Sequence, residues 1–321
     1  MPAAVAIDPV DGIVAAFGSH DVVALTEGAG HGHDQGHAFL VSLLEDPRLV
    51  GVVDDIVVEW GNSLYQDVID RYTSGRDVPF TELRQVWENT TQPHTVWDSP
   101  VFAAFFEAVR ARNEAFPDGL HLRVLLGDPP VDWDEVSSPR DLALFSRERD
   151  AYPADLIRNE VVENGRRALV VYGGLHLIRL PRQRNTPAPD DPDLQYVSQS
   201  LVMRLEGMGI RVFNVFGVSI DVAAEIQPTA SDWEPVTMTL IDDTILGIAG
   251  FQEYFPSADA TPMQDQFDAL MIYGPRSSMT FSEFPPELCQ DERYIEMRTG
   301  RMRISDPQEF VRRYCRTGDA D

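Results

Sequence analysis

Short, nearly continuous apolar runs recur along the chain, and their alternation with helical patterns is the feature that most constrains the fold. Each run is rich in β-branched residues and ends in a polar or glycine-containing turn, as is typical of parallel strands covered on both faces. We expect strands at 21–25, 55–60, 122–128, 167–174, 210–218 and 267–274. Strands that alternate with helices predict an α/β fold, with a mainly parallel central sheet flanked by helices.

Apolar residues at helical spacing fill most of the intervals between these runs. We expect helices at 34–46, 64–74, 79–91, 99–116 and 146–164. Pro153 is expected to kink or divide the last of these. The interval 62–120 is too long for a plain crossover, so we predict a helical lobe inserted over the carboxyl ends of the strands. The proline- and charge-rich segment 179–195 is predicted to be a loop or lid, within a single domain that spans 1–321.

The composition excludes several classes of function. All 26 basic residues are arginine, so no mechanism that needs a lysine, such as a Schiff base or a Walker A phosphate site, operates here. The formal net charge of −26 argues against nucleic acid or an anionic membrane as a partner, since both need a basic surface. We therefore expect a small molecule as the substrate. The composition specifies neither the identity of that molecule nor the oligomeric state of the protein.

The cysteines and the first residues bear on the cellular compartment. Cys289 and Cys315 form neither a zinc knuckle nor a disulfide framework, so reduced, structural thiols are the favoured interpretation. Residues 1–12 lack the basic and apolar regions of a signal peptide, and no apolar run is long enough to span a membrane. These features lead us to expect a cytoplasmic protein.

One stretch, TEGAGHGHDQGH at 26–37, concentrates glycines and imidazoles. It has four interpretations: a metal site, an acid–base centre, a phosphate-binding loop, or a polar loop without chemistry. Its glycine spacing does not fit the dinucleotide-binding pattern, and the carboxylate of Glu27 would repel phosphate. An acid–base or metal-assisted centre is the interpretation that we prefer.

The carboxyl ends of the expected strands carry carboxylates and imidazoles. Glu27 and His31 follow the first strand, Glu59 ends the second, and His176 follows the fourth. Reactive groups gather beyond these ends in open α/β sheets, so we predict that the four side chains meet in one cavity. Residues with a supporting or substrate-binding role are predicted to be Asn62, Asp128, Arg149, His37 and Trp60.

Structural interpretations stand beside these functional ones. A glutamate that ends an apolar strand needs a charged partner, so Glu59 is alternatively a buried ion pair with an arginine. His37 lies on the apolar face of its helix, where core histidines are common, and Asp128 alternatively caps the turn into two prolines. His31, Glu59 and His176 together also suit Zn²⁺, Mn²⁺ or Co²⁺, so a divalent metal is a possible cofactor.

The arrangement resembles the erythromycin esterase family, which belongs with the ChaN-like and Tiki proteins. The family's first motif, of Gly-Glu-x-x-His-Gly type, is similar to residues 26–32, which are one residue longer and lack the leading glycine. Glu59 resembles the second glutamate, Arg149 and Asp150 the Arg-Asp motif of a helix, and His176 the late histidine. The resemblance covers roughly 20–180 and implies an α/β core with a helical lobe that hydrolyses an ester, lactone or amide, with metal dependence differing between branches.

A hydrolytic mechanism follows from these groups. We expect His31 or Glu59 to activate water as a general base, a neighbouring glutamate to stabilise the imidazolium, and His176 to protonate the leaving group. Backbone N–H groups of 28–32 are expected to stabilise the oxyanion. The alternatives are a biosynthetic cyclase or lyase that uses the same pocket, and a carrier of haem or another metabolite. Aromatic residues expected to give an apolar pocket are Trp60, Tyr65, Trp87, Trp97 and Trp133.

Overall fold

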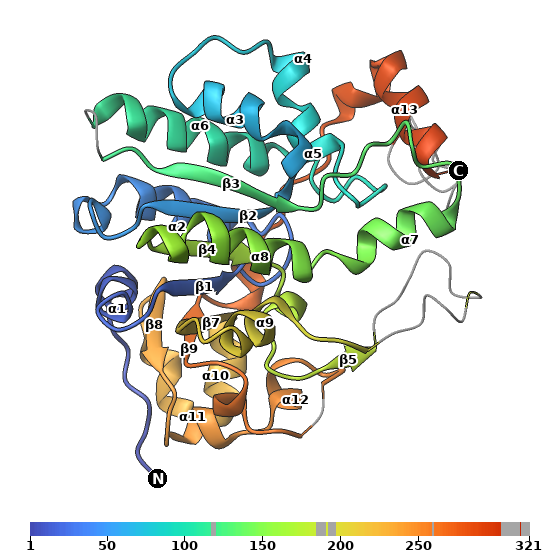
Figure 1. Ribbon diagram of the computed structural model, residues 1–321. Helices are drawn as coiled ribbons and strands as arrows, with labels where there is room; N and C mark the ends of the chain where they lie inside the picture. The colour runs from blue at the N-terminus through green and yellow to red at the C-terminus, as the bar shows by residue number, and fades with distance from the viewer. Residues whose placement is uncertain (117–119, 184–190, 192–196, 259, 303–314, 316–321) are drawn as a thin grey trace.

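A seven-stranded sheet forms the centre of the computed structural model, which describes residues 1–116, 120–183, 191, 197–258, 260–302 and 315. Its strands lie in the order β3-β2-β4-β1-β7-β9-β8, and β3, β2, β4 and β1 follow one another from the top of Figure 1 downwards. Their bounds are Val22–Thr26 for β1, Asp55–Asn62 for β2, Arg123–Asp128 for β3, Ala168–Tyr172 for β4, Val212–Val218 for β7, Thr237–Leu240 for β8 and Ala269–Ile272 for β9. The α/β class that the sequence predicts is confirmed.

The inner strands could be predicted from the sequence because they are parallel and buried along their whole length. Every residue of β1, β2 and β4 is buried, because helices cover both faces of the sheet. The strand that sequence analysis missed is β8, which pairs antiparallel with β9 at the edge. Its four residues, TMTL, alternate apolar and polar side chains, so they lack the continuous apolar pattern of the inner strands.

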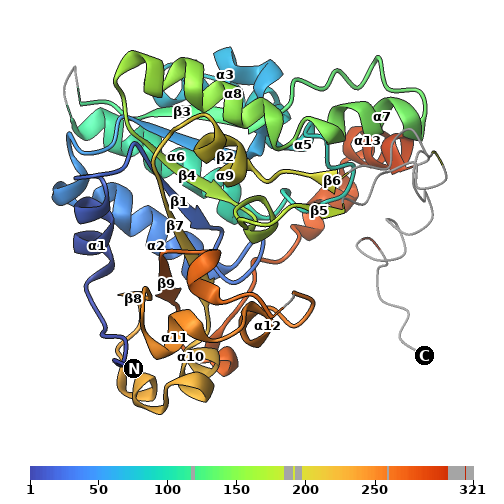
Figure 2. The ribbon, with the colours of Figure 1, turned by 60° about the horizontal axis from the view of Figure 1, so that its bottom comes forward.

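Helices form two layers, and alternate residues of each strand point to one or the other. One apolar cluster packs the sheet against α1, α2, α3, α5 and α6, and the other packs it against α8 to α12, of which α8 and α9 are seen over one face in Figure 2. The helix bounds are Pro9–Ala16 for α1, Asp34–Glu45 for α2, Gln66–Thr73 for α3, Phe80–Leu83 for α4, Gln85–Glu88 for α5, Pro100–Ala115 for α6, Pro139–Arg147 for α7, Ala151–Glu160 for α8, Leu201–Gly207 for α9, Ile220–Ile226 for α10, Ile245–Ile248 for α11, Phe251–Tyr254 for α12 and Glu292–Met302 for α13.

The helix predicted at 146–164 begins later and is not kinked. It starts at Ala151, so Pro153 lies in the first turn, where its missing N–H has no helical partner to lose. The preceding residues belong to a separate helix, α7. Of the segment 62–120, α3 and α6 pack on one face of the sheet, while the loop after α5 reaches the carboxyl ends of β2 and β3 through hydrogen bonds described below.

Three further expectations meet the structure here. Cys289 and Cys315 form a disulfide, with Cα atoms 5.4 Å apart, so the prediction of reduced thiols is wrong; a count of two thiols carries no information about their distance in the fold. Most of the predicted lid, 179–195, lies outside the described residues, although its flanks form a two-stranded sheet of β5 (Arg182–Gln183) and β6 (Val197–Ser198). In the part of the chain that is described, no helix is long and apolar enough to cross a bilayer.

Candidate active site

The carboxyl ends of four neighbouring strands bring the predicted residues together. β3, β2, β4 and β1 are adjacent and parallel, and Asp128, Glu59, His176 and Glu27 lie at or just after their ends. Their side chains therefore lie at the same edge of the sheet, and all four are buried. Buried charges need partners, and these residues find them in one another and in neighbouring arginine and histidine residues.

The loop after β1 surrounds Glu27 with hydrogen-bond donors. Oε1 of Glu27 accepts a hydrogen bond from the backbone N–H of Gly32 at 2.8 Å and lies 3.0 Å from Nε2 of His37, while Oε2 lies 2.8 Å from Nδ1 of His31. Gly28 and Gly32 have φ values of 59° and 70°, which glycine adopts without steric cost. The glycines of the motif thus let the loop turn back on the carboxylate.

This arrangement changes the proton affinities of both partners. Burial raises the pKa of Glu27, but the hydrogen bonds with His31 and His37 outweigh it, so the pKa lies below its ordinary value and the carboxylate is ionised. Burial lowers the pKa of His31, whereas the bond to Glu27 and the charge of Glu59 raise it, to about 8. His31 is therefore a stronger base than a solvated histidine.

His31 is also the member of this pair that reaches open space. Its side chain is 38% exposed, against 1% for Glu27, and its ring packs edge-on against Trp97 with centroids 4.6 Å apart. Nδ1 is held by Glu27; Nε2 makes no hydrogen bond with any described residue. One ring nitrogen is thus oriented by a buried anion while the other is available.

Glu59 is the centre of a second buried network. The register between β2 and β3 is irregular around this residue. Oε1 of Glu59 contacts the guanidinium of Arg149 and lies 3.1 Å from Nε2 of His176, and Oε2 accepts the backbone N–H of Gly173 at 2.7 Å. Burial raises the pKa of Glu59, but His176 and Arg149 lower it well below its ordinary value. Glu59 is therefore ionised, with both oxygens occupied.

His176 lies between two carboxylates. Nδ1 is 2.7 Å from Oδ1 of Asp150, whose other oxygen accepts a hydrogen bond from Oγ of Ser198 at 3.3 Å. Since Nε2 contacts Glu59, both ring nitrogens are engaged, and in this arrangement His176 orients Glu59. The sequence pointed to Asp150 only as part of the Arg-Asp motif. Its position next to Arg149 was the one feature of the sequence that could have indicated it as the partner of His176.

Gly173 joins the two networks. A Cβ at this position would lie 2.8 Å from Cε1 of His31 and 3.0 Å from Oε2 of Glu59. Its N–H already donates to Glu59, so the backbone passes directly between the two side chains. The absence of a side chain here is what allows all four predicted residues to belong to one cluster.

We expect Gly173→Ala to displace His31 and Glu59, costing about 1–3 kcal/mol of stability, as overpacking typically does. Denaturant unfolding measures the loss. The matched control is Gly207→Ala, because a Cβ there would meet no atom within 4 Å. Equal behaviour of the two variants would show that the close approach at Gly173 has no consequence.

Asp128 and Asn62 hold loops in place and do not reach open space. Burial raises the pKa of Asp128 to about 7, although Arg149 and hydrogen bonds from Thr91 lower it; its oxygens accept the N–H and Oγ–H of Thr91, each at 2.6 Å. Asn62 donates to the carbonyls of Asn89 and Val131 at 2.7 and 2.8 Å. Both residues therefore fix the loops that flank the site.

Trp60 and His37 lie beneath the site, within the apolar layer. Trp60 is fully buried and packs on Phe102 and Phe105, with ring centroids 5.4 and 5.2 Å apart. His37 packs edge-on against Phe102 at 5.0 Å while its Nε2 contacts Glu27. His37 is thus a core histidine whose polar edge serves the site, which combines the two interpretations of its sequence position.

The metal site predicted at His31, Glu59 and His176 is not assembled. The oxygens of Glu59 are occupied by Arg149, His176 and a backbone N–H, and the nitrogens of His176 by two carboxylates. Among the described residues, no group of three or more His, Cys, Asp or Glu is placed to hold a metal ion. Two of the three predicted ligands, Glu59 and His176, already use their donor atoms in hydrogen bonds and ion pairs, so the set does not fit a metal.

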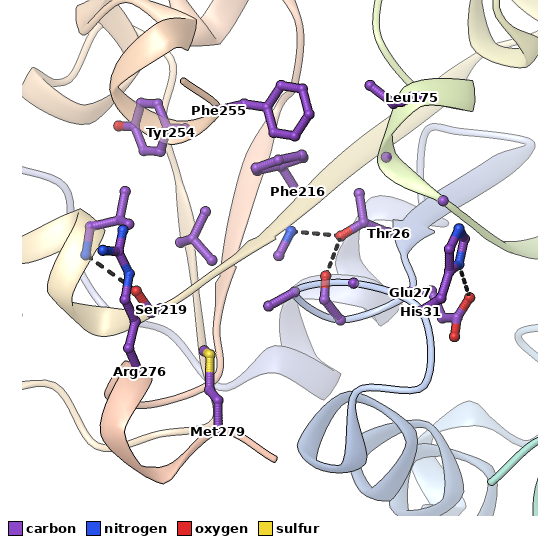
Figure 3. A pocket seen from close by; sticks show the side chains of 18 of the residues that line it. Thr26, Glu27, His31, Leu175, Phe216, Ser219, Tyr254, Phe255, Arg276 and Met279 are labelled. Atoms are coloured by element: carbon purple, nitrogen blue, oxygen red, sulfur yellow. Dashed lines mark hydrogen bonds and ion pairs between the residues drawn. The ribbon is translucent and has the colours of Figure 1, made fainter. Parts of the chain in front are cut away.

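A cavity of about 530 Å³ opens beside His31. Its lining includes Glu27, His31 and Gly173 but neither Glu59 nor His176, so the prediction that all four side chains meet in one cavity holds for Glu27 and His31 alone. Figure 3 shows Phe216, Phe255 and Tyr254 on one side of this space and His31 hydrogen-bonded to Glu27 on another. The volume and the largely apolar wall suit a small-molecule ligand.

Sequence reasoning missed the residues that form most of this wall. Those outside the strand ends nearest His31 are Phe216, Phe251, Tyr254, Phe255, Arg276 and Met279. Phe216 stands near the end of an expected strand and could have been found by that position. The others come from the segment after β7, whose short helices lack a sustained apolar period. The five aromatic residues expected to give an apolar pocket are absent from the described lining of this cavity, so that prediction is wrong, although Trp97 contacts His31.

Comparison with known proteins supports the fold and leaves the family open. No family model matches the chain, and no curated protein is significantly similar in sequence. A Bacillus cereus protein of known structure is 11% identical with a TM-score of 0.52, covering 86% of this chain and 93% of its own. A succinoglycan biosynthesis protein is 11% identical with a TM-score of 0.56, covering 88% and 96%.

A third structure, haem-bound ChaN of Campylobacter jejuni, is 10% identical with a lower TM-score of 0.43, covering 82% of this chain and 91% of its own. At such identities the similarity concerns the fold, and one fold hosts many functions. The first two comparisons establish that this chain shares its architecture with those two proteins, and its function has to be argued from the site.

Proposed function

We propose that the protein is a hydrolase that cleaves an ester, lactone or amide of a small molecule, as the resemblance to the erythromycin esterase family implies. The observation that carries this proposal is the Glu27–His31 pair at the cavity. Nδ1 of His31 is bound to a buried, ionised glutamate, and the ring is partly exposed towards an apolar cavity. The same division of roles orients the general base in hydrolases with a His–carboxylate pair.

In the proposed reaction, Nε2 of His31 takes a proton from water as the oxygen attacks the substrate carbonyl. The carbonyl oxygen becomes an oxyanion, and Glu27 stabilises the imidazolium. The tetrahedral intermediate then collapses, and the imidazolium returns its proton to the leaving oxygen or nitrogen. Glu59 is less suited to be the base, because both its oxygens are occupied.

The expected oxyanion donors differ from those of the sequence-based proposal. Backbone N–H groups of Gly28, Ala29, Gly30 and Gly32 are bound to acceptors within their own loop. Gly174 and Leu175 line the cavity, and in the described part of the chain their N–H groups meet no acceptor. We therefore propose these two N–H groups as oxyanion donors, since preorganised donors at such a point stabilise developing charge.

A pH profile of hydrolysis tests the proposal. His31 acts as a base only when neutral, and its pKa is raised to about 8, so kcat/KM for a panel of 4-nitrophenyl esters and lactones should rise tenfold per unit below that pH and level off above it. Glu27→Gln removes the anion that raises this pKa, so the rise should move to lower pH. The plateau should fall by about 10²-fold, since the imidazolium loses its stabilising partner.

Glu45→Gln provides the control, because Glu45 is an exposed carboxylate at the end of α2. A rate that stays constant between about pH 6 and 9, or that is unchanged in Glu27→Gln, would contradict the assignment of His31 as the base.

Two other functions use the same cavity. A cyclase or lyase would employ His31 without water, and reaction in ¹⁸O-labelled water separates the cases, since only hydrolysis places solvent oxygen in the product. The apolar wall around Phe216 and Phe251 also suits a carrier of haem or another metabolite. His31 lines the cavity and could serve as an axial ligand of haem. A Soret band that appears on haem titration and is lost in His31→Ala would therefore favour the carrier function.

A further inference from the structure

The cavity has a second polar end, away from His31. Arg276 begins the short helical turn Arg276–Ser278 and belongs to the lining. Figure 3 shows Arg276 and His31 at opposite sides of the space, with Thr26 and Phe216 between them. The backbone N–H of Arg276 donates to Oδ2 of Asp221 at 2.6 Å, which fixes the turn that presents the side chain.

The positive charge at this end is exposed, and no carboxylate in the described part of the chain neutralises it. Arg276 is the one Arg or Lys side chain in the described lining of the cavity, and among the described residues no carboxylate forms an ion pair with its guanidinium. The one carboxylate of the lining, Glu27, is already bound to two histidines. In a chain of net charge −26, whose overall field repels anions, this side chain gives the cavity a local attraction for them.

Between the two polar ends the wall is aromatic. Phe216 packs edge-on against Phe251 with centroids 5.7 Å apart, and Phe251 stacks on Phe255 at 6.1 Å. These rings are linked in one cluster and offer an apolar surface with a defined shape. A ligand that spans the cavity would therefore meet a base at one end, apolar surface along its length and a cation at the other end.

We propose that the natural substrate is amphipathic and carries a carboxylate or phosphate that binds Arg276, while its apolar body lies on the aromatic wall and its scissile bond lies at His31. A guanidinium binds such anions through paired, charge-assisted hydrogen bonds. The position of the scissile bond rests on the proposed function; the anion site does not, because it is tested by binding alone.

The test compares ligands of matched length that contain no carboxylic ester, lactone or amide bond. Titration calorimetry with 6-phenylhexanoate and with the neutral 6-phenylhexan-1-ol should show the acid bound about tenfold more tightly by the parent protein. Arg276→Gln should weaken binding of the acid by about tenfold while changing that of the alcohol by less than about twofold, and Arg276→Lys should retain part of the preference. The arm with 6-phenylhexyl phosphate distinguishes a preference for phosphate from one for carboxylate.

Arg211→Gln is the matched control. Arg211 is exposed and pairs with Asp21. It stands just before β7 begins, at the opposite end of the strands from the cavity. Its replacement by Gln therefore changes the net charge by the same amount as Arg276→Gln but at a distance from the cavity. Equal affinity for acid and alcohol, an unchanged acid affinity in Arg276→Gln, or failure of every probe to bind would overturn the proposal. If His31→Ala abolishes hydrolysis while Arg276→Gln changes no affinity, the anion site fails and the hydrolase proposal stands.

Discussion

His31→Ala is expected to lower kcat/KM for ester hydrolysis by about 10²–10⁴-fold, the usual contribution of a positioned general base. The ring is partly exposed, and its Nδ1 is the partner of buried Glu27, so the substitution removes the base and leaves the carboxylate bound to His37 and Gly32. Steady-state rates on the ester and lactone panel, with circular dichroism to establish folding, measure the effect. Added imidazole should restore part of the rate, because the deleted ring leaves space beside the cavity.

His121→Ala controls for the loss of a histidine in general. His121 is exposed and, among the described residues, bonds only the carbonyl of Phe116, outside the candidate site. Its activity should match that of the parent protein. Hydrolysis at the parent rate by His31→Ala, across the whole panel, would rule out His31 as the base and with it the proposed mechanism.

Arg149→Met is expected to destabilise the protein by about 3–5 kcal/mol, as happens when one partner of a buried ion pair is removed. The guanidinium contacts Glu59 and lies 3.8 Å from Asp128, and these carboxylates are 2% and 1% exposed. Without Arg149, Glu59 would keep His176 and the N–H of Gly173 as partners, and Asp128, whose pKa burial raises to about 7, would lose the cation beside it. Urea unfolding followed by tryptophan fluorescence measures the loss.

Two comparisons make this prediction specific. Arg158→Met removes an exposed arginine from α8 whose partner Asp155 is also exposed, and should cost less than about 1 kcal/mol. Combining Arg149→Met with Glu59→Gln should cost less than the sum of the single changes, because the second substitution removes an anion that the first deprives of its arginine partner. Additive losses would indicate that Arg149 stabilises the fold through packing alone.

The strand-end residues illustrate how far the sequence could be interpreted. Glu27, Glu59 and His176 were predictable as a group, because parallel strands all end at one edge of the sheet and each residue stands at or shortly after the end of an apolar run. His31 was predictable from its glycine-flanked loop. The contacts of each side chain were harder to predict from the sequence. Both nitrogens of His176, for example, are engaged by carboxylates, and these contacts join residues that are far apart in the chain.

The sequence by itself therefore determined the layered α/β architecture and the edge at which polar groups collect, because both follow from local periodicity and from the buried, continuously apolar strands. Tertiary structure alone decided the aromatic wall, the approach of Gly173 to His31 and Glu59, the edge strand β8 and the disulfide between Cys289 and Cys315. Each of these depends on distances between segments that are remote in sequence, and such distances are set by packing, which leaves no local pattern in the chain.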